Sequence, residues 1–235
     1  MLSGQLPTAI GAYDNAAEFA ASTPTLMHYL AAAGYRTILS GKMHFIGPDQ
    51  LHGFHERLVT DIYPADFAWT PNWLAGPTDK PSGISMRNVV EAGQCVRSLQ
   101  MDYDDEVEHF AIQRLYDLAR EPDRPPFFMT VSFSHPHPPY TIGQEHWDRF
   151  RHEDIDLPSV TIPLDERDAH SRWLHTSHGA DEMPVTTEQV RNARHAYYGM
   201  IEYVDDKVGR LVKTLEDCRL RDDTIVAFVA DHGEM

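Results

Sequence analysis

The sequence contains little cysteine and no long apolar run. Its two cysteines, Cys95 and Cys218, are far apart and have no paired spacing, which excludes a disulfide-rich scaffold and predicts reduced thiols. A single disulfide in a secreted protein is the alternative. No apolar run approaches the roughly 18 residues that span a bilayer, and the first residues show no basic and apolar leader pattern. We therefore expect a cytoplasmic protein.

Positive charge is also scarce. Lysine and arginine number 20 against 36 aspartates and glutamates, so the formal net charge is −16. This balance argues against nucleic acid or a membrane surface as a partner, because both carry negative charge themselves. A local cationic group can still bind a small anion. With 42% hydrophobic residues the chain has enough apolar side chains for a folded core.

Alternating helix and strand patterns predict the fold. Three stretches place apolar residues at helical spacing: residues 24–33, 104–119 and 187–215. Three short apolar runs have the composition of buried strands: residues 35–40, 127–133 and 224–230. Because helix and strand alternate, we predict an α/β fold with a mostly parallel sheet flanked by helices. Residues 45–100 are irregular and contain several prolines, and so long a loop commonly serves function.

Each predicted strand is followed by residues that can carry out chemistry. These are Lys42 and His44, then His135 and His137, and finally Asp231 and His232. Ligands of parallel sheets gather beyond the carboxyl ends of the strands, so we expect a shared site there. A lysine can hold an ester oxyanion, and an imidazole can protonate a leaving group. Asp231 with the adjacent His232 could form half of a divalent-metal site.

Ordinary structural roles are the alternatives. Lys42 and His44 could be surface residues after a strand, and residues 231–233 could form a turn. His137 is favoured over His135 because prolines on both sides restrict its backbone.

Aromatic residues are concentrated in the irregular loop: Tyr63, Phe67, Trp69 and Trp73. Aromatic faces attract quaternary ammonium groups by about 0.5 to 2 kcal/mol each, so the loop could form a cage for such a ligand. The alternative is that these side chains form the small core of the loop itself. Asn15 could add a polar contact or simply belong to a turn.

Residues 34–44 resemble the second signature of the type I sulfatases, Gly-Tyr-x-Thr-x-x-x-Gly-Lys-x-His, and match it at every fixed position. The resemblance continues at residues 136–139, 197–205 and 231–234 and so covers nearly the whole chain. Within that family, residues 40–54 and 60–67 resemble the choline sulfatases.

The resemblance implies an alkaline-phosphatase-like α/β fold and hydrolysis of a sulfate ester by a formylglycine nucleophile. It also implies a divalent cation, with Ca²⁺ expected and Mn²⁺ or Mg²⁺ as alternatives. By this resemblance Lys42 and His44 bind sulfate oxygens, and His137 assists the leaving oxygen. Asp231, with His232 beside it, ligates the metal.

The resemblance further implies a small-molecule sulfate ester as partner and a homo-oligomeric parent enzyme. Trp69 is then the candidate for the trimethylammonium group of choline sulfate, and Asn15 is a second pocket residue. The expected products are choline and sulfate. The alternatives are a sulfatase, phosphonate hydrolase or phosphodiester hydrolase of the same superfamily that acts on another small ester, or a non-catalytic remnant.

The sequence also departs from the family pattern. It contains no Cys/Ser-x-Pro-x-Arg motif, which in the family carries the formylglycine, and no paired aspartates near residue 1. By the resemblance, residues 1–235 are a partial catalytic domain, which lacks the N-terminal metal and nucleophile segment and a C-terminal portion. We therefore expect the chain alone to be inactive and its sheet to be incomplete.

Overall fold

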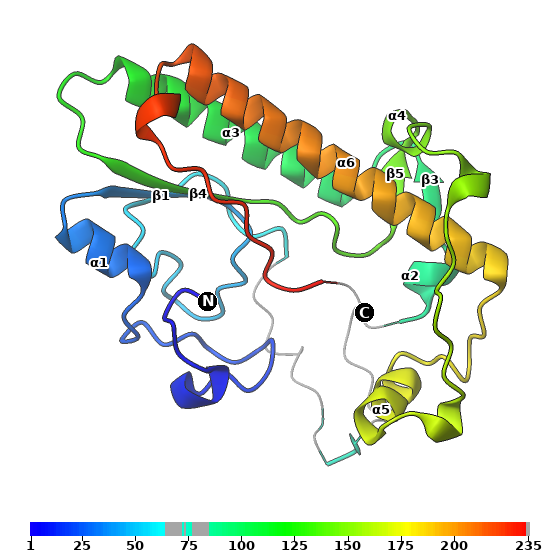
Figure 1. Ribbon diagram of the computed structural model, residues 1–235. Helices are drawn as coiled ribbons and strands as arrows, with labels where there is room; N and C mark the ends of the chain where they lie inside the picture. The colour runs from blue at the N-terminus through cyan, green and yellow to red at the C-terminus, as the bar shows by residue number, and fades with distance from the viewer. Residues whose placement is uncertain (64–71, 73, 77–84, 234–235) are drawn as a thin grey trace. The chain divides into compact units, whose positions relative to one another are not determined.

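The computed structural model describes residues 1–63, 72, 74–76 and 85–233 (Figure 1). The chain divides into two compact units. The first unit combines Met1–Phe67, Leu99–Ser134 and Val204–Met235, and the second combines Ala68–Ser98 and His135–Tyr203. None of the helices in the described residues has the length and apolarity needed to cross a membrane.

The first unit is built on a parallel sheet of three strands. β1 (Arg36–Gly41) lies in the centre, between β2 (Glu56–Arg57) and β4 (Phe127–Ser132). The register aligns β1 with β4 over the whole length of both strands, so their carboxyl ends lie at the same edge of the sheet. The predicted strands at residues 35–40 and 127–133 are therefore confirmed, as is their parallel pairing.

Helices cover both faces of this sheet. α1 (Leu26–Ala32) lies on one face, and α3 (Leu99–Arg120) lies with the C-terminal part of α6 (Thr187–Asp217) on the other (Figure 1). Successive strand residues point to opposite faces, which explains why Ile38 packs toward α3 and α6 while Leu39 packs toward α1. Both side chains are fully buried, which stabilises the fold by about 1.5–3 kcal/mol each.

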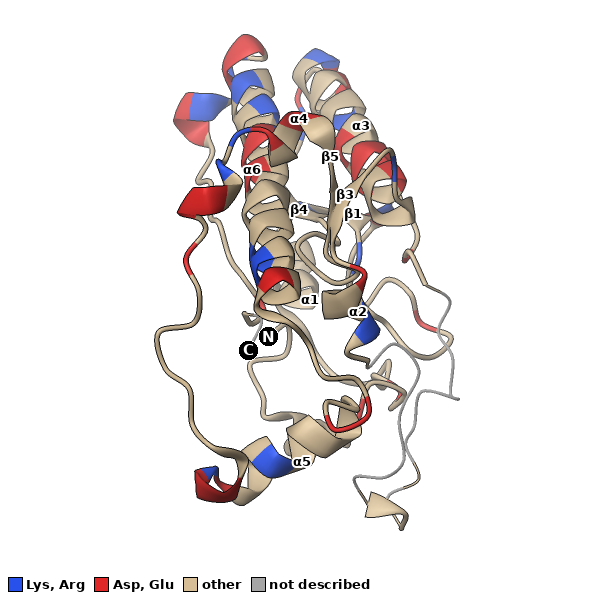
Figure 2. Cartoon of the chain, turned by 90° about the vertical axis from the view of Figure 1, so that its right-hand side faces the viewer, with Lys and Arg blue, Asp and Glu red and all other residues tan. Residues whose placement is uncertain are grey.

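Paired charges connect α3 to the C-terminal part of α6. Both helices carry acidic and basic positions along their length (Figure 2). The fully buried Lys207 Nζ lies 2.5 Å from Asp105 Oδ1 and 2.9 Å from Glu108 Oε2, and Arg210 also forms an ion pair with Glu108. Burial of a charge is tolerated only where partners compensate it, and here two carboxylates and a second cation do so.

The second unit contains a smaller parallel sheet of β3 (Gly93–Cys95) and β5 (Thr141–Gly143). Its helices are α2 (Arg87–Val90), α4 (Gln144–Trp147), α5 (Ala169–Ser177) and the N-terminal part of α6. Four short 3₁₀ helices complete the described elements: Pro7–Ile10, His152–Asp154, Leu164–Glu166 and Arg221–Asp223.

The three predicted helices are confirmed, although α3 begins five residues before the predicted stretch. The predicted strand at residues 224–230 is wrong. These residues pair with no strand in the part of the chain that the structure describes, and Ile225 and Phe228 are 97% and 76% exposed. An apolar run becomes a strand only where a neighbouring strand accepts its hydrogen bonds, and the sequence pattern does not identify that neighbour.

Candidate active site

β1 ends in a close approach to β4. Gly41 has φ +113°, and a Cβ atom on it would lie only 2.0 Å from the carbonyl oxygen of Ser132. Only glycine fits such a position without displacing the backbone. The next residue, Lys42, donates its backbone N–H to the same Ser132 oxygen at 3.0 Å. Lys42 therefore lies directly at the edge of the sheet where β1 and β4 end, and it is half-buried.

A carboxylate from a later loop holds the turn after Lys42. Asp61 Oδ1 accepts the backbone N–H groups of Met43 at 2.8 Å and His44 at 3.2 Å. Asp61 Oδ2 lies 2.8 Å from Arg57 Nη2, and these two side chains are only 15% and 8% exposed. Sequence reasoning missed both residues, because Arg57 lies in the two-residue strand β2 and Asp61 in the loop after it, and both segments are too short or irregular to show a periodic pattern.

The structure brings two predicted site residues into contact. The Nε2 atom of His44 lies 3.0 Å from the backbone carbonyl oxygen of Asn15. A carbonyl oxygen only accepts, so Nε2 carries the proton in this contact. The orientation of the His44 ring is thus coupled to the N-terminal segment through the backbone of Asn15, whose side chain is exposed.

A buried tyrosine on α3 fixes the segment that carries Asp61. Tyr103 is 7% exposed, and its hydroxyl donates to the carbonyl oxygen of Thr60 at 2.8 Å. Burial raises the pKa of Tyr103 above its ordinary value, and the negative charge of Asp61 adds to this effect. The hydroxyl therefore remains protonated and keeps its role as a donor.

The two histidines after β4 have different surroundings in the second unit. His135 is 6% exposed, and its ring packs edge-on against Tyr203 with the centroids 4.9 Å apart. His137 is exposed, and its Nδ1 donates to the Pro138 carbonyl oxygen at 2.8 Å. His137 is thus the more accessible of the two rings, and its preference over His135 stays a prediction.

Asp231 and His232 lie on the extended segment that follows α6. Their side chains are 79% and 72% exposed, and Asp231 Oδ1 accepts the backbone N–H of His232 at 2.9 Å. No cluster of three acidic, histidine or cysteine ligands that includes Asp231 occurs among the described residues. These two residues alone do not complete a cation site, because Ca²⁺ takes six to eight oxygen ligands.

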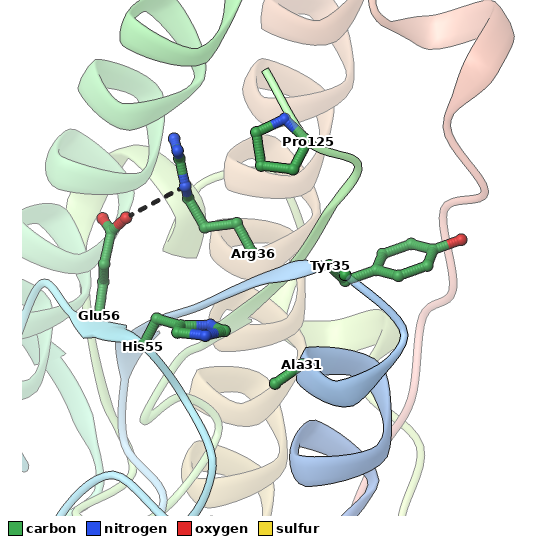
Figure 3. A pocket seen from close by; sticks show the side chains of 7 residues that line it. Ala31, Tyr35, Arg36, His55, Glu56 and Pro125 are labelled. Atoms are coloured by element: carbon green, nitrogen blue, oxygen red, sulfur yellow. Dashed lines mark ion pairs between the residues drawn. The ribbon is translucent and has the colours of Figure 1, made fainter. Parts of the chain in front are cut away.

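An open cavity of ≈ 280 Å³ lies at the other end of β1 (Figure 3). Its lining includes Arg36, His55 and Glu56. The Arg36 Nε atom lies 3.9 Å from Glu56 Oε1, and its guanidinium also donates to Glu121 Oε1 at 2.8 Å. Arg114 also pairs with Glu56 at 2.7 Å, so two cations and two carboxylates balance beside the cavity, which leaves no net positive charge in this cluster to attract a sulfate group.

Comparison with known proteins then identifies the family. A sequence model described as Sulfatase matches residues 1–235. The chain belongs to the sulfatase family. It is 49% identical to the choline-sulfatase of Rhizobium meliloti (strain 1021), over 100% of this chain and 47% of that protein. It is 25% identical to the arylsulfatase of Clostridium perfringens (strain 13 / Type A), over 90% of this chain and 47% of that protein.

Solved structures agree with the predicted fold of this sulfatase chain. The phosphonate monoester hydrolase from Silicibacter pomeroyi superposes with a TM-score of 0.62 at 17% identity, over 94% of this chain and 49% of that chain. At this identity the likeness shows the fold alone, and the predicted alkaline-phosphatase-like α/β architecture is confirmed. The chain spans about half the length of the curated relatives it matches.

The predicted site of this sulfatase is thus described in part. Lys42 and His44 lie at the carboxyl end of β1, and Asn15 contacts His44. The predicted substrate residue Trp69 lies outside the described residues. The roles assigned to His137, to the metal-binding pair and to the other site residues stay predictions.

Proposed function

We propose that the whole protein hydrolyses choline sulfate to choline and sulfate. The observation that carries this proposal is the 49% identity to a choline-sulfatase over the full length of the chain. The held turn after β1 supports it, since it presents Lys42 and His44 where ligands of parallel sheets bind.

The proposed reaction consumes one water: the bond between sulfur and the choline oxygen breaks, the sulfur gains another oxygen in its place to give sulfate, and the choline oxygen leaves with a proton. The Lys42 ammonium balances charge on the sulfate oxygens, and His44 donates a hydrogen bond to them. His137 supplies the proton to the leaving oxygen. In the family that residues 34–44 resemble, a formylglycine supplies the nucleophile and a divalent cation supplies further positive charge.

We propose that the 235-residue chain alone does not turn over sulfate esters. It contains no Cys/Ser-x-Pro-x-Arg motif that could carry a formylglycine, and within the described part of the chain no cluster of three metal-ligating side chains includes Asp231 or His232. Release of sulfate from choline sulfate by this purified chain would contradict that statement.

The test of the function uses the full-length protein that contains these residues. Sulfate release is measured from choline sulfate and 4-nitrophenyl sulfate, and hydrolysis of a phosphonate monoester is measured alongside. We expect choline sulfate to have the highest kcat/KM, and Lys42→Ala to lower it by about 10²–10³-fold, the usual effect of removing one charge-stabilising donor. Lys213→Ala is the matched control, because Lys213 lies exposed on α6 and pairs with Asp217 at 2.6 Å. A higher kcat/KM for the phosphonate would favour the alternative hydrolase instead.

A second variant tests the choline end of the substrate. We propose that Trp69 contacts the trimethylammonium group, an interaction that contributes about 0.5–2 kcal/mol. Trp69→Ala should then lower kcat/KM for choline sulfate several-fold more than for 4-nitrophenyl sulfate, which has no cation. An equal loss for both substrates would assign Trp69 to the structure of its loop rather than to recognition.

A further inference from the structure

The turn after β1 needs a support that the sheet does not provide. β1 ends at Gly41, so Met43 and His44 receive no hydrogen bonds from the strand ladder. His44 also has φ +57°, in the left-handed region that residues other than glycine seldom adopt. Other contacts hold this backbone in place, and two of them come from the loop that contains Asp61.

Asp61 makes two hydrogen bonds to this turn with one oxygen. Its Oδ1 atom accepts from the consecutive N–H groups of Met43 and His44, at 2.8 and 3.2 Å. The two groups belong to residues that are 17 and 18 positions before Asp61 in the sequence. The contact therefore fixes the turn from outside its own segment.

Arg57 holds the carboxylate of Asp61 in place. Its Nη2 lies 2.8 Å from Asp61 Oδ2, and its Nη1 donates to the side chain of Gln50 at 2.7 Å. The amide of Gln50 then donates to the carbonyl oxygens of Phe45 and Gly47, at 2.9 and 2.8 Å. Asp61 thus binds the backbone at residues 43 and 44, and Arg57 binds the backbone at residues 45 and 47 through Gln50.

We propose that Asp61 is a positioning residue that sets the conformation of the Lys42–His44 turn for binding of a sulfate group. This inference rests on the proposed function, because it takes Lys42 and His44 to be sulfate-binding residues. Asp61 acts through the backbone of Met43 and His44 and does not itself contact the anion. Arg57 supports it by holding the carboxylate in place.

The chain contains a matched control for this role. Asp49 Oδ1 accepts the backbone N–H groups of Leu51 and His52 at 2.9 and 3.1 Å, and His52 has a positive φ of 42°. Asp49 and Asp61 therefore each accept two backbone N–H groups, one of them from a histidine in the left-handed region, and Asp49 in addition lies 3.3 Å from Nδ1 of the His52 ring. Only Asp61 accepts such groups at the predicted sulfate-binding turn.

The experiment titrates the ¹⁵N-labelled 235-residue chain with inorganic sulfate and follows amide shifts by NMR. Amide exchange of Met43 and His44 is measured on the same samples without sulfate. We expect Asp61→Ala to accelerate exchange at both amides and to weaken sulfate binding about tenfold or more. Asp61→Asn keeps an oxygen acceptor and should restore most of the affinity. Asp49→Ala should leave sulfate affinity within about twofold of wild type.

The outcomes separate this inference from the proposed function. Unchanged exchange at Met43 and His44 in Asp61→Ala overturns the positioning role, as does sulfate affinity equal to wild type in that variant. An equal loss of affinity in Asp49→Ala overturns it too, because the effect would then be general destabilisation. If the wild-type chain binds no sulfate, that result counts against the sulfate-binding turn of the proposed function, and the exchange data alone then decide whether Asp61 holds the backbone.

Discussion

The close approach of β1 to β4 makes a strong prediction for Gly41→Ala. The added Cβ would lie 2.0 Å from the Ser132 carbonyl oxygen and 3.1 Å from Val107 Cγ1. Real Cβ atoms do not approach a backbone oxygen so closely, so the ends of β1 and β4 must move apart. The Ser132 oxygen also accepts the Lys42 N–H, and that bond is lost if the strands separate.

The magnitude follows from these contacts. An alanine forced into the left-handed region costs about 1–2 kcal/mol. Displacing packed backbone costs about 1–3 kcal/mol more, and the lost hydrogen bond about 1 kcal/mol. We expect Gly41→Ala to lower the free energy of unfolding by roughly 3–6 kcal/mol, a large part of the 5–15 kcal/mol that is typical of a domain.

Gly34→Ala is the matched control for this substitution. Gly34 has φ +88°, and a Cβ atom on it would meet no atom within 4 Å. The control therefore also places alanine at a positive φ but without the collision, and should lose only about 1–2 kcal/mol.

Urea unfolding of the 235-residue chain, followed by circular dichroism, measures both variants. If Gly41→Ala and Gly34→Ala lose the same stability, the contact with Ser132 is not the reason for glycine at position 41 and the reasoning fails.

Two further predictions concern buried polar groups. His52 is fully buried between two phenylalanine rings, and burial lowers its pKa below the unfolded value of about 6.5, so the unfolded chain binds more protons between these two pKa values. The stability that neutral His52 contributes is present above about pH 6.5 and is lost as the pH falls through the folded pKa. His52→Leu should therefore reduce the dependence of the unfolding free energy on pH, measured by urea unfolding. An unchanged pH dependence would contradict this prediction. Lys207→Met leaves the buried Glu108 without one of its partners and should lower the free energy of unfolding by about 3 kcal/mol. The control Lys213→Met, at an exposed position, should lower it by under about 1 kcal/mol. Equal losses of stability in the two variants would refute the role of the buried pairing.

The central elements of the fold could be predicted because burial leaves a pattern in the sequence. β1 buries the adjacent apolar residues Ile38 and Leu39 on its two faces, and α6 keeps one apolar stripe over its length. β2, β3 and β5 have only two or three residues each, which is too short for any periodicity. The run at residues 224–230 has the composition of a strand, but pairing depends on a neighbour that composition does not specify.

The candidate site could be predicted where chemistry follows a strand. Lys42 and His44 were found because they come directly after a buried run. Asp61 left no such signal in the sequence. Its side chain accepts N–H groups from the backbone of Met43 and His44, and such a contact imposes no hydrophobic pattern on the residues between position 44 and position 61. The difference between His135 and His137 depends on packing against Tyr203, and a contact over that sequence separation is set by the tertiary structure.

The Arg57–Asp61 pair also bears on how an acidic chain holds the turn that we propose as sulfate-binding. An isolated carboxylate beside Lys42 would repel sulfate, since two unit charges 4 Å apart near a protein surface interact by about 4 kcal/mol. Asp61 Oδ2 lies 2.8 Å from Arg57 Nη2, and both side chains are largely shielded from water, so salt screens the pair little. The pair as a whole is neutral, yet it still supplies an oxygen to accept the N–H groups of Met43 and His44. The neutral pair therefore adds little repulsion toward an anion at this turn, although the chain as a whole carries a net charge of −16.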